Sequence, residues 1–325
     1  MASPGENGFL RRLIFVALLA LLVPGNSHVL AAEGETNGAL KLTLVYSLST
    51  NAVAHAAGHN PDNDMRALAN WRYGDYNKTN LALLTNAVWA TNFWLYGVRG
   101  LSATCIGFSN GLGGQGLITM VSPRHYLFAS HMHPEGYLVP FLDTNNVIYW
   151  RKTLERAEVT APFATKVSLD TSVGILNADL PPSVGFMPVV PTNLSNYIPE
   201  SKTLIVQGIG MNQDMKYFGQ PMGFGDVPFV VWDSRFASAH GLPASWNIGL
   251  RSGDSSNPEM LLIGNQLVLL SHNYSIQGGP NYAYLFGAIN QTMHELSKHN
   301  HVRSDYQLTT VPLRNWPRIV VTGGK

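Results

Sequence analysis

The chain has 325 residues, a formal net charge of +1 and 13% charged residues, so it lacks the clustered basic charge that nucleic-acid binding requires. Its length suffices for one large domain or two small ones, and a chain of this size buries enough surface to fold without covalent staples. Cys105 is the single cysteine, which excludes an intramolecular disulfide.

The first residues have the pattern of a secretory signal peptide. Two arginines precede an uninterrupted apolar run, Leu13 to Val23, and a Pro-Gly pair follows it. This run is shorter than the roughly 20 apolar residues that span a bilayer, and the alternative is an uncleaved membrane anchor. We expect cleavage near Ala31 or Ala32, so residues 1–32 are interpreted as the signal peptide. The mature protein is then secreted or periplasmic, with no stable membrane span.

Residues 33–100 are interpreted as an N-terminal extension that packs on the main domain. Leu81, Leu84 and Val88 recur at spacings of three and four, which is typical of one helix face. We therefore predict one amphipathic helix over Asn80 to Leu95.

From residue 101 onward the pattern changes to short apolar runs separated by turn residues, which is typical of β-strands. The first expected group is Thr104–Phe108, Gly116–Val121, Tyr126–Ala129, Val147–Leu154 and Val173–Leu176. A linker, Met187 to Pro199, separates it from a second group. The second group is Thr203–Gly208, Phe229–Trp232, Met260–Ile263, Leu267–Ser271 and Tyr282–Phe286.

A helix over about Ala288 to Lys298 is the last expected element, and a tail continues to residue 325. The pattern predicts an all-β domain over 101–325 in two halves, about 101–190 and about 200–287, closed by a C-terminal helix.

Three local patterns contain residues that could carry chemistry. His131 ends the run Phe128-Ala129-Ser130-His131, Asp170 comes directly before a buried run, and Ser255 lies in the glycine-containing turn Ser252 to Pro258. Each pattern alone is common, but their order on an all-β chain suits one catalytic site that uses a serine nucleophile. Serine attacks a carbonyl carbon, histidine takes the serine proton, and aspartate holds the histidine.

These motifs resemble those of the trypsin/chymotrypsin-like serine peptidase family, of which the chain would be a divergent member without disulfides. Ala129-Ser130-His131 is similar to the family's Ala-Ala-His motif, and Asp170 to Leu176 to its Asp-Ile-Ala-Leu-Leu type of motif. Gly253-Asp254-Ser255 with Pro258 is similar to Gly-Asp-Ser-Gly-Gly-Pro. The resemblance covers roughly Leu101 to Lys298. It implies two perpendicular six-stranded Greek-key β-barrels with the triad between them.

The resemblance also implies how the site works. The backbone N–H groups of Gly253 and Ser255 would form the oxyanion hole. Gly249 would lie at the base of the primary specificity pocket, where the absence of an acid gives no support for Lys or Arg specificity. The strand that ends in Ser271, His272 and Asn273 would pair with the substrate backbone, although His272 could equally be a surface histidine. The implied substrate is a protein or peptide, and no cofactor or metal is implied.

The chain departs from the family pattern at two positions. Ser256 and Asn257 stand where the family usually has two glycines, and a side chain at Ser256 would strain the turn if its φ is positive. We therefore expect reduced activity, with two alternatives. One is an inactive homologue that binds a protein, and the other is a hydrolase that acts on esters.

Three nearby residues compete for roles at the site. His133 is a second candidate base, and Asp179 is a second candidate acid. His131 and His133 could also be metal ligands, although no third ligand is close to them in the sequence. Asp254 has two interpretations: it pairs with a new N-terminal amine after cleavage at Arg99, or it braces its own turn, which is the interpretation that we prefer.

Overall fold

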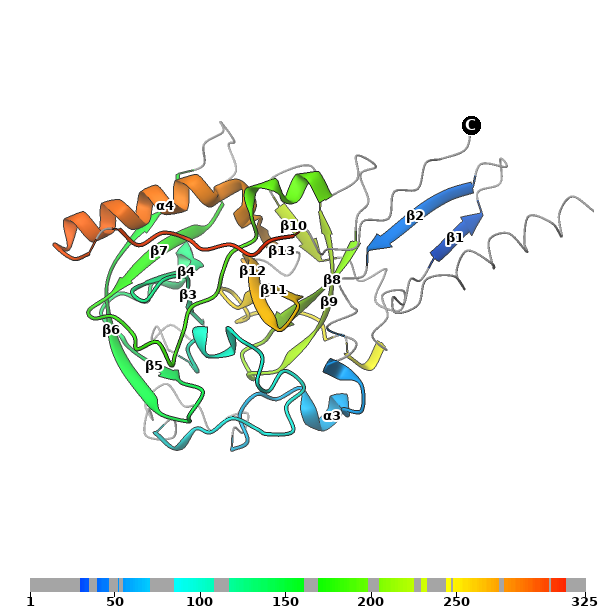
Figure 1. Cartoon of the computed structure of the whole chain (residues 1–325), viewed down its shortest axis with the longest axis horizontal. Coiled ribbons are helices and arrows are strands. Elements are labelled where there is room, and N and C mark those ends of the chain that lie inside the picture. Colours follow the sequence, from blue (N-terminus) through cyan, green and yellow to red (C-terminus); the bar gives the residue numbers. More distant parts are fainter. Residues whose placement is uncertain are drawn as a thin grey trace, which may run out of the picture.

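The structure is a computed structural model of the chain (Figure 1). It describes residues 30–34, 40–46, 52, 55–70, 85–107, 117–160, 169–197, 205–224, 229–232, 244–246, 248–274, 278–303 and 305–313. These residues form two β-sheets and one long C-terminal helix, α4 (Tyr282–His299), that packs against the first sheet (Figure 1). The all-β class with a closing helix is confirmed, and the arrangement is consistent with a chymotrypsin-like fold.

The first sheet is antiparallel, with the strand order β3-β4-β7-β6-β5, and it curls as Figure 1 shows. Its strands are β3 (Thr119–Met120), β4 (His125–Ala129), β5 (Leu138–Leu142), β6 (Ile148–Glu158) and β7 (Thr171–Leu176). Every residue of β4 and β7 is buried, because these short apolar runs lie at the centre of the sheet.

The second sheet follows the path β1-β2-β8-β9-β10-β13, with β11 paired to β8 and β12 paired to β11. Its strands are β1 (Leu30–Gly34), β2 (Leu40–Tyr46), β8 (Ile205–Met211), β9 (Tyr217–Phe224), β10 (Phe229–Trp232), β11 (Pro258–Ile263), β12 (Gln266–His272) and β13 (Gly278–Pro280). Within the part that the structure describes, the second half contributes the six expected strands, β8 to β13, and β1 and β2 of the extension join them, whereas the first half has five strands.

Two strand predictions are wrong. The predicted strand Thr104–Phe108 does not form in its described part: Thr104 makes only an isolated bridge to Thr119, because the chain before it, Leu101–Ala103, forms a 3₁₀ turn. Phe108 lies outside the described residues. The predicted strand Tyr282–Phe286 is instead the first part of α4.

Helix α4 begins earlier than expected because Asn281 caps it. The Asn281 side chain accepts a hydrogen bond from the Ala283 N–H at 3.1 Å. The buried apolar side chains of α4 then follow the helical spacing. They include Tyr282, Leu285, Ile289, Met293 and Leu296.

The predicted helix over Asn80 to Leu95 is also wrong in its described part, residues 85–95. Trp89 makes an antiparallel bridge to Leu68, and the Ala90 N–H donates to the Ala67 carbonyl at 2.8 Å. Consecutive buried residues in this segment, Phe93 to Leu95, do not fit one helix face. Among the described residues of the extension, Pro61–Asp64 form the short helix α3.

The N-terminal strands relate the extension to the second sheet. β2 runs parallel to β8, with Val45 opposite Ile205. β1 contains Ala31 and Ala32, so the expected signal cleavage would remove part of that strand. The apolar run Leu13 to Val23 lies outside the described residues. Among the helices that the structure describes, none is long and apolar enough to cross a membrane.

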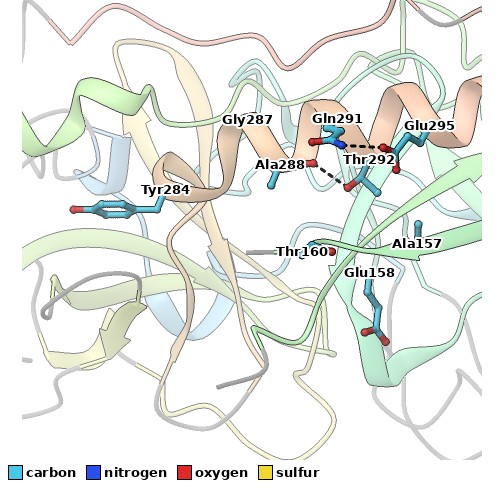
Figure 2. A pocket seen from close by; sticks show the side chains of 9 residues that line it. All are labelled: Ala157, Glu158, Thr160, Tyr284, Gly287, Ala288, Gln291, Thr292 and Glu295. Atoms are coloured by element: carbon cyan, nitrogen blue, oxygen red, sulfur yellow. Dashed lines mark hydrogen bonds between the residues drawn. The ribbon is translucent and has the colours of Figure 1, made fainter. Parts of the chain in front are cut away.

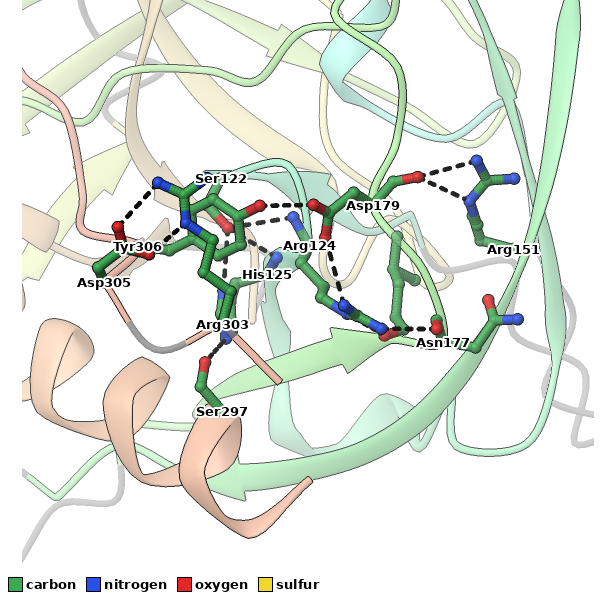
Figure 3. A network of polar contacts seen from close by, with 11 residues as sticks. Ser122, Arg124, His125, Arg151, Asn177, Asp179, Ser297, Arg303, Asp305 and Tyr306 are labelled. Carbon is green, nitrogen blue, oxygen red and sulfur yellow. Dashed lines mark hydrogen bonds and ion pairs between the residues drawn. The ribbon is translucent and has the colours of Figure 1, made fainter. Parts of the chain in front are cut away.

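A polar network fastens the start of β4 to α4 and to the C-terminal tail (Figure 3). The two ring nitrogens of the buried His125 each lie 2.9 Å from a serine hydroxyl, Ser122 before the strand and Ser297 on α4. The Tyr306 hydroxyl in the tail donates to the Asp179 carboxylate at 2.5 Å. These contacts hold the strand that leads to His131.

Candidate active site

His131 and Asp170 lie together at the edge of the first sheet where β4 ends and β7 begins. His131 belongs to the 3₁₀ turn Ser130–Met132, directly after β4, and Asp170 comes directly before β7. Because β4 and β7 are paired, with Ala129 opposite Thr171, the two residues must meet. One oxygen of the Asp170 carboxylate lies in hydrogen-bond contact with His131 Nδ1 at 2.5 Å, and the other oxygen accepts the His131 backbone N–H at 3.1 Å.

This contact fixes the chemical state of the His131 ring. The hydrogen bond to Asp170 raises the pKa of His131 above its ordinary value, while partial burial acts in the opposite direction. In the neutral ring, Nδ1 carries the proton because a carboxylate only accepts. The second ring nitrogen, Nε2, has no hydrogen-bond partner among the described residues, so it can accept a proton.

The competing residues have other partners. The ring nitrogen Nδ1 of His133 contacts the Arg156 guanidinium at 3.1 Å. Asp179 belongs to the network of Figure 3, where it also pairs with Arg124 at 3.5 Å. Neither residue joins the pair His131 and Asp170.

Ser255 lies in the turn that leads into β11, and its side chain is partly buried. The structure gives the Ser255 hydroxyl no hydrogen-bond partner among the described residues, so the contact to His131 that the sequence predicts is not made here. Such contacts are often long before a substrate is bound.

Asp254 is buried and braces its own turn. Its carboxylate accepts the backbone N–H groups of Gln213 and Arg251, each at 2.9 Å. Burial raises the pKa of Asp254, against the opposing effect of these two hydrogen bonds. The preferred interpretation of Asp254 as a local brace agrees with these contacts.

The backbone N–H groups of the turn fall into two kinds. Those of Asp254, Ser256 and Asn257 donate to carbonyl groups at 2.7 to 3.1 Å. Those of Gly253 and Ser255 donate to no acceptor within the described residues. Gly253 has a φ of 97°, a backbone conformation that favours glycine, and a β-carbon there would lie 3.0 Å from the amide end of the Gln213 side chain.

Ser256 has the positive φ, 69°, that the departure from the family pattern made a concern. Its side chain nevertheless has a defined partner. The Ser256 hydroxyl, 1% exposed as a residue, accepts the Ala129 backbone N–H at 2.7 Å. The positive φ meets the condition under which strain is expected, and the hydrogen bond to Ala129 is a contact that the sequence did not predict. No local sequence signal announces this contact, which joins residues 127 positions apart.

The residues expected to bind substrate differ in exposure. Gly249 is exposed, whereas Ser271, His272 and Asn273 are buried. The alternative that His272 is a surface residue is wrong. Its Nε2 lies 3.1 Å from the Asp170 carbonyl oxygen, and its Nδ1 faces the hydroxyl of Tyr282, which sequence reasoning missed.

A buried polar cluster between β9, β11 and β12 was also missed. The Glu259 carboxyl, fully buried, accepts from the Gln220 amide at 3.4 Å, and burial raises the pKa of Glu259 to about 8. One Glu259 oxygen and both side-chain polar atoms of Asn273 have no hydrogen-bond partner in the part of the chain that the structure describes. Polar residues in otherwise apolar strands give no sign from sequence of which neighbours they meet.

A cavity of about 640 Å³ lies elsewhere, between the end of β6 and the outer face of α4 (Figure 2). Its lining is about equally polar and apolar, and its polar residues include Glu158, Gln291 and Glu295. None of the predicted site residues lines it. No group of three His, Cys, Asp or Glu side chains that could hold a metal occurs in the described part of the chain.

No family model matches the chain, and no curated protein matches its sequence. Among solved structures, a Glu endopeptidase in complex with MPD is similar, with 16% identity over 60% of this chain and 91% of that chain. The TM-score is 0.41.

Proposed function

We propose that the chain is a serine hydrolase that cleaves peptide bonds through His131, Asp170 and Ser255. The observation that carries the proposal is the His131–Asp170 hydrogen bond of 2.5 Å, which leaves His131 Nε2 open. A base held in one tautomer beside a serine-containing turn is the arrangement that activates a serine hydroxyl.

The reaction follows from these groups. His131 Nε2 removes the Ser255 hydroxyl proton as Oγ attacks the substrate carbonyl carbon. The free N–H groups of Gly253 and Ser255 stabilise the negative oxygen that forms, and one such donor contributes about 10²–10³ in rate. The protonated His131 then gives its proton to the leaving amine, and water releases the acyl group from Ser255 by the same steps.

Support for a peptide substrate comes from strand β12. Bridges to Arg99 and Val189 cover its outer edge at Gln266 and Leu269. Beyond Leu269 no strand is hydrogen-bonded to that edge in the described residues, but Ser271 and His272 are buried and Gly279 of β13 lies against the His272 carbonyl, so an extended peptide would pair there only after this cover moves. Gly249 and the residues Ser271 to Asn273 remain the proposed substrate-binding positions.

Hydrolysis of matched peptide and ester substrates tests the proposal, with Ser255→Ala as the control. We expect the wild type to cleave both and the variant to cleave neither. Cleavage of esters alone would favour an esterase. Equal turnover by Ser255→Ala would place the nucleophile elsewhere.

The second candidate is an inactive homologue that binds a protein. The Ser255 hydroxyl, which makes no contact with His131 in the described structure, is the observation that favours it.

We also propose that the protein is exported, and mass spectrometry of the mature form should find a new N-terminus near Ala32. An intact Met1 on a membrane-bound product would favour the anchor.

A further inference from the structure

We propose that Ser256 and His272 are positioning residues that join the turn of Ser255 to the pair His131 and Asp170. This inference rests on the proposed hydrolase function. It assigns a purpose to the serine that replaces a family glycine and to a histidine that does not reach solvent.

The first contact runs from the nucleophile turn to β4. Ser256 directly follows Ser255, and its hydroxyl accepts the N–H of Ala129, two residues before His131, at 2.7 Å. The Ser256 N–H donates in turn to the Asn273 carbonyl at 2.7 Å. A positive φ strains the backbone of a serine, so the hydrogen bond to Ala129 offsets a strain that glycine would avoid.

The second contact runs from β12 to the acid. The His272 Nε2 must carry the ring proton, because the Asp170 carbonyl oxygen at 3.1 Å can only accept it. The Tyr282 hydroxyl therefore donates to His272 Nδ1. Burial lowers the pKa of His272 to about 4, so the ring is neutral at neutral pH and keeps this tautomer.

The two contacts act on one rigid unit. Asn273 follows His272, and its backbone exchanges hydrogen bonds with the turn: its N–H donates to the Asn257 carbonyl at 3.0 Å. On the other side, the Asp170 carbonyl accepts both His272 and the Ser130 N–H, at 3.0 Å, which holds Asp170 at its φ of 46°. A change of either contact would move Ser255 relative to His131.

A positioning role differs from a merely structural one in its kinetic effect. Misplacing a nucleophile by a fraction of an ångström lowers the rate of the chemical step more than it weakens substrate binding. We expect Ser256→Ala to lower kcat by about 10- to 100-fold with KM changed less than about threefold. Ser256→Gly, which removes the backbone strain as well as the hydroxyl, should not restore kcat.

Conservative variants separate the roles at His272. A glutamine amide can replace the Nε2–H donor to Asp170, whereas an asparagine amide is too short to reach it. His272→Gln should therefore retain more of kcat than His272→Asn. Equal losses in both variants would overturn the assignment of that contact.

The closing experiment combines amide hydrogen exchange at Ala129 with the rate at which a fluorophosphonate labels Ser255. The matched control is Ser297→Ala, because the Ser297 hydroxyl is also buried but contacts His125 at 2.9 Å, at the other end of β4. Ser256→Ala should speed exchange at Ala129 and slow labelling at least tenfold, whereas Ser297→Ala should leave labelling unchanged.

The outcomes are distinct. A wild type that is not labelled would overturn the hydrolase function and this inference together. A wild type that is labelled at the same rate as Ser256→Ala would overturn the inference alone. If Ser256→Ala does not fold, the comparison of His272→Gln with His272→Asn decides.

Discussion

The two ends of β4 place two histidines in opposite environments. At its start, His125 is fully buried, both ring nitrogens face serine hydroxyls at 2.9 Å, and burial lowers its pKa to about 4. Just past its end, the His131 side chain is 46% exposed, one nitrogen is held by Asp170, and its pKa is raised. A histidine with both ring nitrogens hydrogen-bonded is neutral and stabilises the fold, whereas one with a free ring nitrogen can accept and release a proton.

The largest effect on activity should follow from changing the proposed catalytic residues, His131 just past the end of β4 and Ser255. His131→Ala and Ser255→Ala should each lower kcat/KM by about 10⁴-fold or more, since triad members act as a unit. Their melting temperatures should stay close to that of the wild type, because neither side chain is fully buried. Steady-state kinetics and calorimetry check both parts. Retained activity in either variant would remove the proposed triad.

Changing the buried end should have the reverse result. His125→Ala leaves a cavity and two serine hydroxyls without their partner, which should lower the free energy of unfolding by about 2–4 kcal/mol. Denaturant unfolding measures this loss. Turnover per folded molecule should not change, because His125 lies at the far end of β4. Lost turnover with unchanged stability would contradict the distinction between the two histidines.

Glu259 extends the contrast to carboxyl groups. Its pKa is raised to about 8 by burial, whereas in an unfolded chain it would ionise near 4.5. Between these values only the unfolded state loses the proton, so stability should fall as the pH rises from about 4.5 to 8. Glu259→Gln cannot ionise, and its melting temperature relative to the wild type should be higher at pH 8 than at pH 5. The same difference at both pH values would contradict the buried neutral carboxyl.

The smallest expected effect is a shift in titration. The raised pKa of His131 means that hydrolysis should rise with pH through a midpoint above the ordinary 6.5, as the neutral base forms. Asp170→Asn should move the midpoint of the His131 ring signal in NMR downward. The pair stabilises the fold fully below about pH 6.5 and loses that effect as pH rises through the raised pKa. This term is small because the side chain is 46% exposed.

The sequence predicted strands well where short apolar runs are buried, as in β4, β7 and β12. It missed β5 and β9, which contain Pro140 and Pro221, because proline argues against a strand. It also assigned a helix to residues 85–95, where pairing with residues 67–69 decides the backbone instead.

The site divides in the same way. Order along the chain indicated His131, Asp170 and Ser255, because these residues lie in short motifs. The contacts of Ser256 and His272 join residues 127 and 102 positions apart, and no local pattern encodes such pairs. Side chains that position a site through backbone groups far away in the sequence can be identified only from the three-dimensional structure.

Stoichiometric fluorophosphonate labelling, followed by intact mass and peptide mapping, tests the central claim most directly. The account predicts one adduct per wild-type chain, located on Ser255, and none on Ser255→Ala. His131→Ala should react far more slowly, since its serine lacks a base. A folded wild type that forms no adduct, or one labelled at another residue, would contradict the account.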